Sequence, residues 1–385
     1  MEKEMINFRD LKRQYARLKP AIDAQLAEII SSANFISGPQ VRELEKQLAS
    51  YVGRKHCVSC GNGTDAISIA LMACGIGTGD AVFVPDFTFF SSGECPASIG
   101  ATPIFVDINP NTYNMDASSL IKAIESILSE GTLKPKAVIA VDLFGLPADY
   151  DAISLICEKY HLLLLEDGAQ GFGGEYKGSK ACSFGKISTT SFFPAKPLGC
   201  YGDGGAIFTD DDNIAGLCRS LAVHGKNADD KYDNIRIGMN SRLDTIQAGV
   251  LLAKFPIFRD EELEAVNKAA NWYTEQLKNT EGFILPVISN GYYSSWAQYA
   301  IQLPDDVSRD KVQEQLKSRN IPTMVYYKKP MHKQGAFNGT RSAVADCPVT
   351  EYVCEHIICL PIHPYLRHSE VEMISLELVD AVVNL

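Results

Sequence analysis

Between residues 81 and 209, short runs of apolar and β-branched residues alternate with stretches that have helical spacing. The apolar runs are continuous, which is typical of strands that are covered on both faces of a parallel sheet. The pattern therefore predicts an α/β fold with a mostly parallel central sheet flanked by helices. We expect the strands over AVFVP (81–85), TPIFVDI (102–108), AVIAVDLF (137–144), LLLLED (162–167), ISTTSFF (187–193) and GAIFT (205–209).

Two other regions flank this segment. Residues 18–33 and 39–53 have apolar side chains at helical spacing, and the second stretch ends at Gly53. Beyond residue 257, a long charged helical stretch precedes one expected strand and two further helices. A chain of 385 residues has room for two domains. We predict that residues 1–257 form N-terminal helices and a large α/β domain, and that residues 258–385 form a smaller α+β domain.

The charge and hydropathy of the chain argue against two classes of partner. Lys+Arg 36 against Asp+Glu 47 gives a net charge of −11, so neither nucleic acid nor an anionic membrane is an expected partner. A local basic site for a phosphorylated metabolite is compatible with this charge. No apolar stretch approaches the ~20 residues that span a bilayer, and the N-terminus lacks the apolar run of a signal peptide. We therefore expect a cytoplasmic protein.

The eleven cysteines are too sparse for a disulfide scaffold, and several lie within apolar runs. We interpret them as reduced core residues. Cys57-Val-Ser-Cys60 forms a CxxC motif, but it lacks the second pair of a zinc site and the context of a thioredoxin-like redox site. Packing is the favoured interpretation, and no metal site is predicted.

Gly61-Asn62-Gly63-Thr64-Asp65 leads directly into a helical stretch. Glycines before a helix allow close approach of a ligand, and the first N–H groups of the helix suit a phosphate. A helix entry capped by Thr64 or Asp65 explains the motif equally well. The segment has neither the Gly-Lys-Ser/Thr of a P-loop nor the third glycine of a dinucleotide-binding fingerprint.

Asp167 ends the apolar run LLLLED, where a parallel sheet commonly binds its ligand. A carboxylate at this position could keep a ring nitrogen protonated. A helix cap or an ion pair is the alternative interpretation.

Lys196 lies between Pro194 and Pro197, in a stretch that joins two expected strands. The two prolines make this segment stiff and irregular, which suits a lysine that must point in one direction. A desolvated lysine has a lowered pKa and can bond covalently to a carbonyl carbon. The alternative is an ordinary surface lysine in a loop.

Five segments in register, GNGTDA, PDFTFF, EDGAQGFG, SFFPAKPLGCYGDGGA and GMNSRLDTIQA, resemble the DegT/StrS family of nucleotide-sugar aminotransferases. The likeness extends from FRDLKRQY to the PIHP near the C-terminus. The resemblance implies the fold-type-I aspartate aminotransferase architecture and pyridoxal 5'-phosphate (PLP, or PMP in its amino form) as the cofactor. It also implies glutamate as amino donor and a keto nucleotide sugar as substrate.

The resemblance assigns roles residue by residue. Lys196 matches the lysine that bonds to the cofactor and then moves the proton, and Asp167 matches the acid beside the pyridinium nitrogen. Gln170 matches the residue that reaches the 3-hydroxyl. Phe89 matches the aromatic that stacks on the ring, with core packing as its alternative. The positions that match donors to the phosphate are Gly63, Thr64, Asp65 and Ser191.

Asn240 and Arg242, in GMNSRLD, match positions that enter the neighbouring subunit's site, which implies a homodimer. Asn240 would contact the phosphate, and Arg242 could bind a carboxylate or pair with Asp244. The family's Tyr-Pro-x-Pro-Leu-His segment begins here with Tyr327 and ends with His332, and a lysine replaces its first proline. His332 is assigned to the substrate, with an ordinary loop histidine as the alternative.

The substrate predicted from these motifs is a UDP-linked 3-keto-hexuronate in surface polysaccharide or glycan synthesis. A 4-keto sugar is the first alternative. A PMP-dependent sugar dehydratase is a second, but those relatives carry histidine in place of the lysine, and Lys196 argues against it. A non-catalytic sensor need not retain Lys196, Asp167 and Ser191 together. The missing fingerprint disfavours a nicotinamide dehydrogenase.

Overall fold

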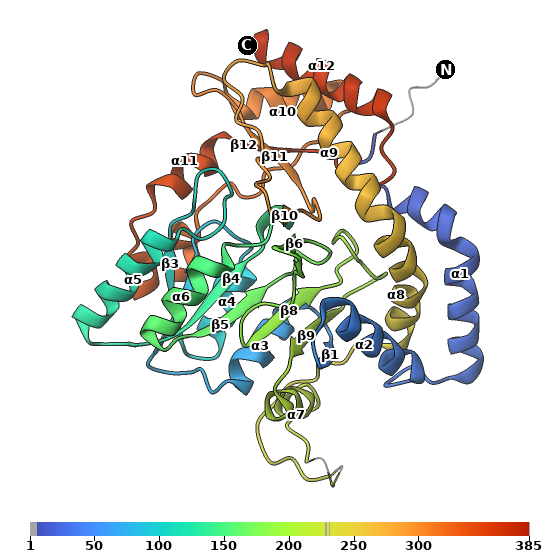
Figure 1. Ribbon diagram of the computed structural model, residues 1–385, viewed down its shortest axis with the longest axis vertical. Coiled ribbons are helices and arrows are strands. Elements are labelled where there is room, and N and C mark those ends of the chain that lie inside the picture. Colours follow the sequence, from blue (N-terminus) through green and yellow to red (C-terminus); the bar gives the residue numbers. More distant parts are fainter. Residues whose placement is uncertain (1–5, 228, 231, 385) are drawn as a thin grey trace.

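A seven-stranded sheet forms the centre of the molecule, with the strand order β1-β9-β8-β5-β4-β2-β3 (Figure 1). The computed structural model describes residues 6–227, 229–230 and 232–384. β9 is antiparallel to both of its neighbours, and the other pairs in the sheet are parallel, so the predicted mostly parallel sheet is confirmed. The strands are β1 (His56–Cys60), β2 (Asp80–Pro85), β3 (Thr102–Val106), β4 (Lys134–Val141), β5 (Leu163–Asp167), β8 (Ile187–Ser191) and β9 (Gly205–Thr209).

Helices cover both faces of this sheet, which explains why its strands are apolar without alternation. In β2, Val82 and Val84 pack in one hydrophobic cluster, whereas Ala81 and Phe83 pack in another on the opposite face. The first cluster contains residues of α3 (Gly63–Ala73), α4 (Ser91–Ser98), α7 (Asp212–Leu221) and α11 (Pro348–His356). The opposite face is covered by α5 (Ala117–Glu130), α6 (Tyr150–Tyr160), α2 (Pro39–Val52) and α8 (Thr245–Ile257).

The N-terminal helix α1 (Leu11–Ser32) packs along α8. It begins seven residues before the expected start at residue 18, because the Asp10 side chain accepts a hydrogen bond from Arg13 N (2.9 Å) and caps the helix. The helix continues through Pro20. α2 ends as expected, with Gly53 in the left-handed conformation (φ 77°) that glycine adopts without strain.

The C-terminal part has its own hydrophobic core, at the top of Figure 1. α8 runs through a π-helical turn (Phe258–Glu262) into α9, so helical structure continues across the predicted boundary at 257/258. The division into two domains stays a prediction. The elements of this part are α9 (Leu263–Leu277), β11 (Tyr299–Gln302), α10 (Arg309–Ser318), β12 (Ile357–Leu360) and α12 (His368–Val383). A small sheet of β6 (Glu175–Tyr176), β7 (Ser179–Lys180) and β10 (Tyr292–Tyr293) lies between the two parts.

The CxxC motif lies on β1, a strand that the sequence pattern did not predict. Residues three apart on a strand point to opposite faces, and Cys57 and Cys60 accordingly pack in different hydrophobic clusters. Their geometry suits core packing. All eleven cysteines are free, and only Cys74 among them is partly exposed.

Within the described residues, no helix combines the length and the apolar character needed to cross a membrane.

Candidate active site

The predicted site residues gather at one edge of the sheet, because the carboxyl ends of parallel strands lie together. β5 ends at Asp167 and β8 ends at Ser191, while Gly61 and Asp86 follow β1 and β2. Lys196 lies in the connection between β8 and β9, on the same edge. The structure therefore brings together four of the five motifs that carry the family resemblance, and the fifth, GMNSRLD, packs against Gly61 through Ser241.

The segment that carries Lys196 folds back on itself. Lys196 N donates to Phe193 O (2.8 Å), and Cys200 N donates to Phe192 O (2.8 Å). Burial lowers the pKa of Lys196 to about 8, the positive charge of Arg9 adds to this effect, and the carboxylate of Asp167 opposes it. A lysine with such a pKa is partly neutral near pH 7 to 8, so it can act as a nucleophile or a base.

Asp167 is buried and hydrogen-bonded on both oxygens. Oδ2 accepts from Ser92 Oγ (2.9 Å) and Oδ1 accepts from Ala169 N (3.2 Å). Burial raises the pKa of Asp167, while these two donors and the charge of Lys196 act in the opposite direction. The preceding Glu166 points to the opposite face of the sheet, where its carboxyl accepts from Phe184 N (2.6 Å). The two acids that end β5 thus point to opposite faces of the sheet, and Asp167 is the one at the site.

The start of α3 forms a cradle that suits a phosphate. A Cβ on Gly63 would lie 2.7 Å from Ser191 Cβ, so only glycine permits this approach of the helix to the end of β8. The first turn of the helix has N–H groups with no preceding turn to accept them. Asp65 N already donates to Asn62 Oδ1 (2.8 Å), and the Thr64 hydroxyl lies 2.7 Å from that of Ser91. The predicted phosphate contacts of these residues stay predictions.

Gln170 and Phe89 lie at the same edge and are linked through Tyr327. Gln170 Nε2 donates to Tyr327 Oη (3.2 Å), and Gln170 Oε1 accepts from Phe144 N (2.9 Å). The Phe89 ring is 53% exposed, and its centroid lies 6.4 Å from that of Tyr327. This exposure does not fit the core-packing alternative. It leaves the ring free to stack against a flat ligand.

Asn240 and Arg242 flank the buried Ser241 in an extended segment beside the phosphate cradle. Ser241 Oγ accepts from Gly61 N (2.9 Å), whereas Asn240 is exposed and Arg242 is partly exposed. Arg242 Nη2 donates to Asn240 Oδ1 (2.5 Å). Within the described part of the chain Arg242 has no ion pair with Asp244, so the structure does not show the alternative role for this arginine.

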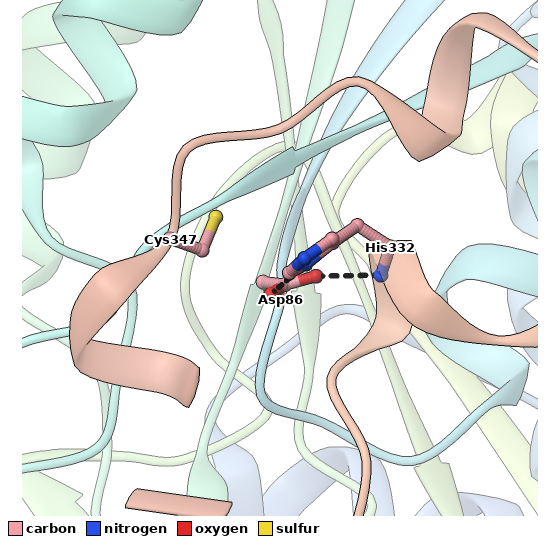
Figure 2. Close-up of side chains that lie close together, drawn as sticks. All are labelled: Asp86, His332 and Cys347. Atoms are coloured by element: carbon pink, nitrogen blue, oxygen red, sulfur yellow. Dashed lines mark hydrogen bonds and ion pairs between the residues drawn. The ribbon is translucent and has the colours of Figure 1, made fainter. Parts of the chain in front are cut away.

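His332 lies in a buried cluster at the end of β2, on the 3-10 turn Met331–Lys333 (Figure 2). Its backbone N donates to Asp86 Oδ1 (2.8 Å), and its Nδ1 lies 2.6 Å from Asp86 Oδ2. Nε2 faces Glu351 Oε1 at 3.3 Å, and Cys347 completes the cluster. Two tetrahedral zinc ligands lie roughly 3.3 Å apart, so the 2.6 Å contact is that of a hydrogen bond.

The hydrogen bond that the His332 ring donates to the Asp86 carboxylate raises the pKa of His332. Both ring nitrogens of His332 thus have partners within the chain. Its predicted contact with the substrate stays a prediction, and any such contact would have to replace Glu351.

Sequence reasoning missed three side chains of this edge: Ser92, Tyr327 as the partner of Gln170, and Arg9. Ser92 lies on α4, a helix that contains Gly93 and Pro96 and gives no helical signal in the sequence. Arg9 precedes α1 by two residues and reaches the site only through the tertiary fold. No local motif marks any of these contacts.

A partly neutral lysine, a buried carboxylate near it and a helix N-terminus, all at one edge of a mostly parallel sheet, define an aminotransferase-type site for a phosphorylated pyridine cofactor. The chain belongs to the DegT/DnrJ/EryC1/StrS aminotransferase family, which it matches over residues 17–379. The resemblance seen in the sequence is thereby confirmed.

Relatives and solved structures agree with this assignment over nearly the whole chain. A UDP-2-acetamido-2-deoxy-3-oxo-D-glucuronate aminotransferase from Pseudomonas aeruginosa is 44% identical, covering 98% of this chain and 100% of its own. A DegT/DnrJ/EryC1/StrS aminotransferase structure from Brucella abortus has 45% identity and a TM-score of 0.93, covering 97% of this chain and 98% of that one. NtdA from Bacillus subtilis, solved with bound cofactor PMP, has 27% identity and a TM-score of 0.89, covering 99% and 86%.

These findings confirm the predicted fold class, a fold-type-I aminotransferase architecture, and the predicted enzyme class, a PLP-dependent nucleotide-sugar aminotransferase. When bound, the cofactor supplies an electron sink through which an amino group passes from donor to acceptor. The predicted roles of Lys196 in proton exchange, of Asp167 opposite the ring nitrogen and of the start of α3 at the phosphate stay predictions.

Proposed function

We propose that this chain moves the amino group of L-glutamate to a UDP-linked 3-keto-hexuronate of the 2-acetamido type, in the synthesis of surface polysaccharide or glycan precursors in the cytoplasm. The position of Lys196 near the buried Asp167 is the main observation that supports transamination as the reaction type. The named activity of the Pseudomonas aeruginosa relative supports the choice of sugar.

The site residues have the following proposed roles. Lys196 bonds to the cofactor and carries the proton, Asp167 holds the ring nitrogen protonated, Gln170 contacts the 3-hydroxyl and Phe89 stacks on the ring. The exposed face of Phe89 and the two hydrogen bonds that fix Asp167 support these roles. The proposed phosphate contacts come from Gly63, Thr64, Asp65, Ser191 and the partner subunit's Asn240.

Arg242 carries the choice of a hexuronate over a 6-deoxy sugar. A guanidinium can form two parallel hydrogen bonds to the sugar carboxylate, and a 6-deoxy sugar has no such group. Arg242 is partly exposed and its one hydrogen bond to a described residue goes to the neutral amide of Asn240, which leaves its charge uncompensated. For His332 the contacts with Asp86 and Glu351 favour a structural role over substrate binding.

A turnover panel tests the substrate. UDP-linked 3-keto-hexuronate, its 3-keto analogue without the carboxylate and dTDP-linked 4-keto-6-deoxy sugar are compared with glutamate as donor, by following 2-oxoglutarate. We expect the hexuronate to be preferred, and Arg242→Ala to reduce that preference. A higher kcat/KM for the dTDP-linked 4-keto sugar would replace the proposal with the 4-keto alternative.

We further propose a homodimer with shared active sites. The outward position of Asn240 and Arg242, on either side of the buried Ser241, supports a contact with a second subunit. Mixing an inactive Lys196→Ala variant with an inactive Asn240→Ala/Arg242→Ala variant would then create dimers with one intact site. After demonstrated subunit exchange, recovery of activity is expected. No recovery would place these residues in their own subunit's site or in neither.

A further inference from the structure

Arg9 lies beside the segment that carries the active lysine, although it is near the start of the chain. Arg9 lines a small cavity together with Pro197, which follows Lys196, and with Ser295 and Glu262, and the rest of the lining is apolar. Ser295 Oγ donates to the carbonyl of Gln170, so this cavity borders two parts of the site. The cavity measures about 20 Å³, which is enough for one water-sized group such as a single oxygen atom.

A chain of aromatic rings also connects the Arg9 segment with the site. The Phe8 and Tyr326 rings lie 6.4 Å apart, and those of Tyr326 and Tyr327 lie 5.7 Å apart. Tyr327 bonds to Gln170. Arg9 thus lies between Phe8, which packs against Tyr326, and Asp10, which caps α1.

The guanidinium of Arg9 has one hydrogen-bond partner among the described residues, the carbonyl of Ala297. No carboxylate of the described chain lies within ion-pair distance of it. Four of the five N–H donors of Arg9 are thus not used by those residues. The four include two neighbouring N–H groups that could bind both oxygens of one carboxylate. Burial lowers the pKa of Arg9 only to about 10, so the group is charged at neutral pH.

The surroundings of Arg9 do not neutralise this charge. The buried carboxylate of Glu262 acts electrostatically on Arg9 and raises its pKa. Glu262 already accepts hydrogen bonds from Gln14 (3.0 and 3.2 Å) and from Tyr365. Glu262 also interacts electrostatically with the buried Lys254. His363 is neutral at pH 7, because burial and the charge of Arg9 lower its pKa to about 4. Arg9, which is partly exposed, and the buried Lys254 thus interact electrostatically with the same carboxylate, and Arg9 has no carboxylate of its own among the described residues.

We propose that Arg9 binds a substrate carboxylate next to Lys196, either the carboxylate of glutamate or that of the hexuronate. Both substrates of a transaminase occupy the same site in turn, so one arginine can serve either or both. The planar fork of Arg9 can form two charge-assisted hydrogen bonds to a carboxylate. This inference rests on the proposed function for the choice of the two carboxylates.

Equilibrium binding to the PLP-loaded enzyme tests the proposal without turnover. The probes are glutarate, which has no amino group to transfer, and the pair UDP-glucuronate and UDP-glucose, which differ in the sugar carboxylate. Dissociation constants are measured by calorimetry for wild type, Arg9→Met and Arg9→Lys. Arg17→Met is the matched control, because Arg17 lies nearby in the chain, on α1, but pairs with Glu261 at the surface.

We expect Arg9→Met to raise the dissociation constant of a carboxylate probe by roughly tenfold to a hundredfold and to leave that of UDP-glucose unchanged. Loss of glutarate binding identifies the donor carboxylate, loss of UDP-glucuronate binding identifies the hexuronate, and loss of both identifies a shared role. Arg9→Lys keeps the positive charge but not the planar guanidinium. This variant should fold as wild type does, and its affinity for the carboxylate probe should lie between those of wild type and Arg9→Met.

Two results would overturn the proposal. One is a folded, PLP-loaded Arg9→Met or Arg9→Lys enzyme that binds all three probes as wild type does, which would make Arg9 a tether to Ala297 only. The other is a wild-type enzyme that shows no binding of glutarate and binds UDP-glucuronate no more tightly than UDP-glucose. Failure of the proposed function looks different, because glutarate would still depend on Arg9 while no UDP-linked sugar was bound or turned over.

Discussion

Two clusters of buried titratable groups lie at the same edge of the sheet, and they differ in how completely their charges are paired. At the end of β2, Asp86 accepts two hydrogen bonds from His332 (Figure 2). Glu351 faces the other ring nitrogen of the imidazole. At the ends of β5 and β8, the ammonium group of Lys196 donates no hydrogen bond to a described residue. Arg9, which lies beside this segment, has no ion pair with a carboxylate of the described residues.

We expect from this difference that the first cluster stabilises the fold and that the second binds ligands. A fully paired buried cluster has nothing to gain from a substrate, because a new contact must replace an existing one. A cluster with unused donors gains when a ligand supplies the missing acceptors. Substitutions in the first cluster should therefore lower stability, and those in the second should lower activity.

The largest expected effect is on activity, in Lys196→Ala. Removal of the amine abolishes both the covalent bond to the cofactor and the proton transfer, so turnover should fall by roughly 10⁴-fold or more. The visible absorbance of the attached cofactor should disappear, while the melting temperature of the chain without added cofactor stays within a few degrees of wild type. Lys186→Ala, which removes an exposed lysine paired with Asp211, is the control. A Lys196→Ala enzyme with wild-type turnover would contradict the site.

Asp167→Asn and Asp86→Asn form a matched pair, since both aspartates are buried at strand ends. Asp167→Asn removes the charge opposite the ring nitrogen, so we expect a loss in kcat of about a thousandfold with little change in melting temperature. Asp86→Asn should clearly lower the melting temperature and change kcat less than Asp167→Asn does. Steady-state kinetics and thermal unfolding measure both. Equal effects of the two variants on kcat would remove the distinction between the clusters.

His332→Gln should lower the free energy of unfolding by about 1–3 kcal/mol at pH 6, because it breaks a buried charge-assisted hydrogen bond. The pKa of His332 is raised above its usual value, so the pair contributes fully below about pH 6.5. That contribution is lost as the pH rises through the raised pKa. The difference between wild type and variant in urea unfolding should therefore be larger at pH 6 than at pH 9.

The control for this experiment is His56→Gln, which breaks an imidazole contact with Asp212 at the surface. A His332→Gln enzyme of unchanged stability whose KM for the nucleotide sugar rises tenfold would instead favour the predicted substrate contact.

The smallest expected effect is that of Ser92→Ala. The hydroxyl donates to Asp167 Oδ2, and its loss costs about 1 kcal/mol of stabilisation of the carboxylate, or roughly a fivefold decrease in kcat. Ser98→Ala, at the exposed end of the same helix, should have no effect on kcat. A hundredfold loss in Ser92→Ala would mean that this serine contacts the cofactor or substrate itself.

Local sequence features predicted six of the seven strands of the central sheet and pointed to residues that the fold places at one edge of it. The continuous apolar runs ending at Pro85 and Asp167 predicted their strands to within a residue, because burial on both faces leaves an unambiguous pattern. Lys196, Asp167 and Gly63 lie in motifs whose residues are close in the chain. They also lie together in space, because parallel strands bring their ends to one edge.

The contacts that sequence reasoning missed join residues far apart in the chain. The Asp86–His332 pair is separated by 246 residues, and Gln170 and Tyr327 by 157. Neither pair has a spacing that a local pattern could reveal. β1 was missed for a different reason, since a five-residue strand containing two cysteines and a serine has little strand signal.

The burial of the cysteines has a practical consequence for following the folded state. Cys74, at the end of α3, is the one thiol of the eleven that is partly exposed. A bulky maleimide should therefore label the native enzyme at a single position, close to the end of α3 that is opposite the proposed phosphate site. Every further label would report the opening of the core. Cys74→Ser would give an enzyme that stays unlabelled until it unfolds, so thiol counting could report its unfolding rate without a spectroscopic probe.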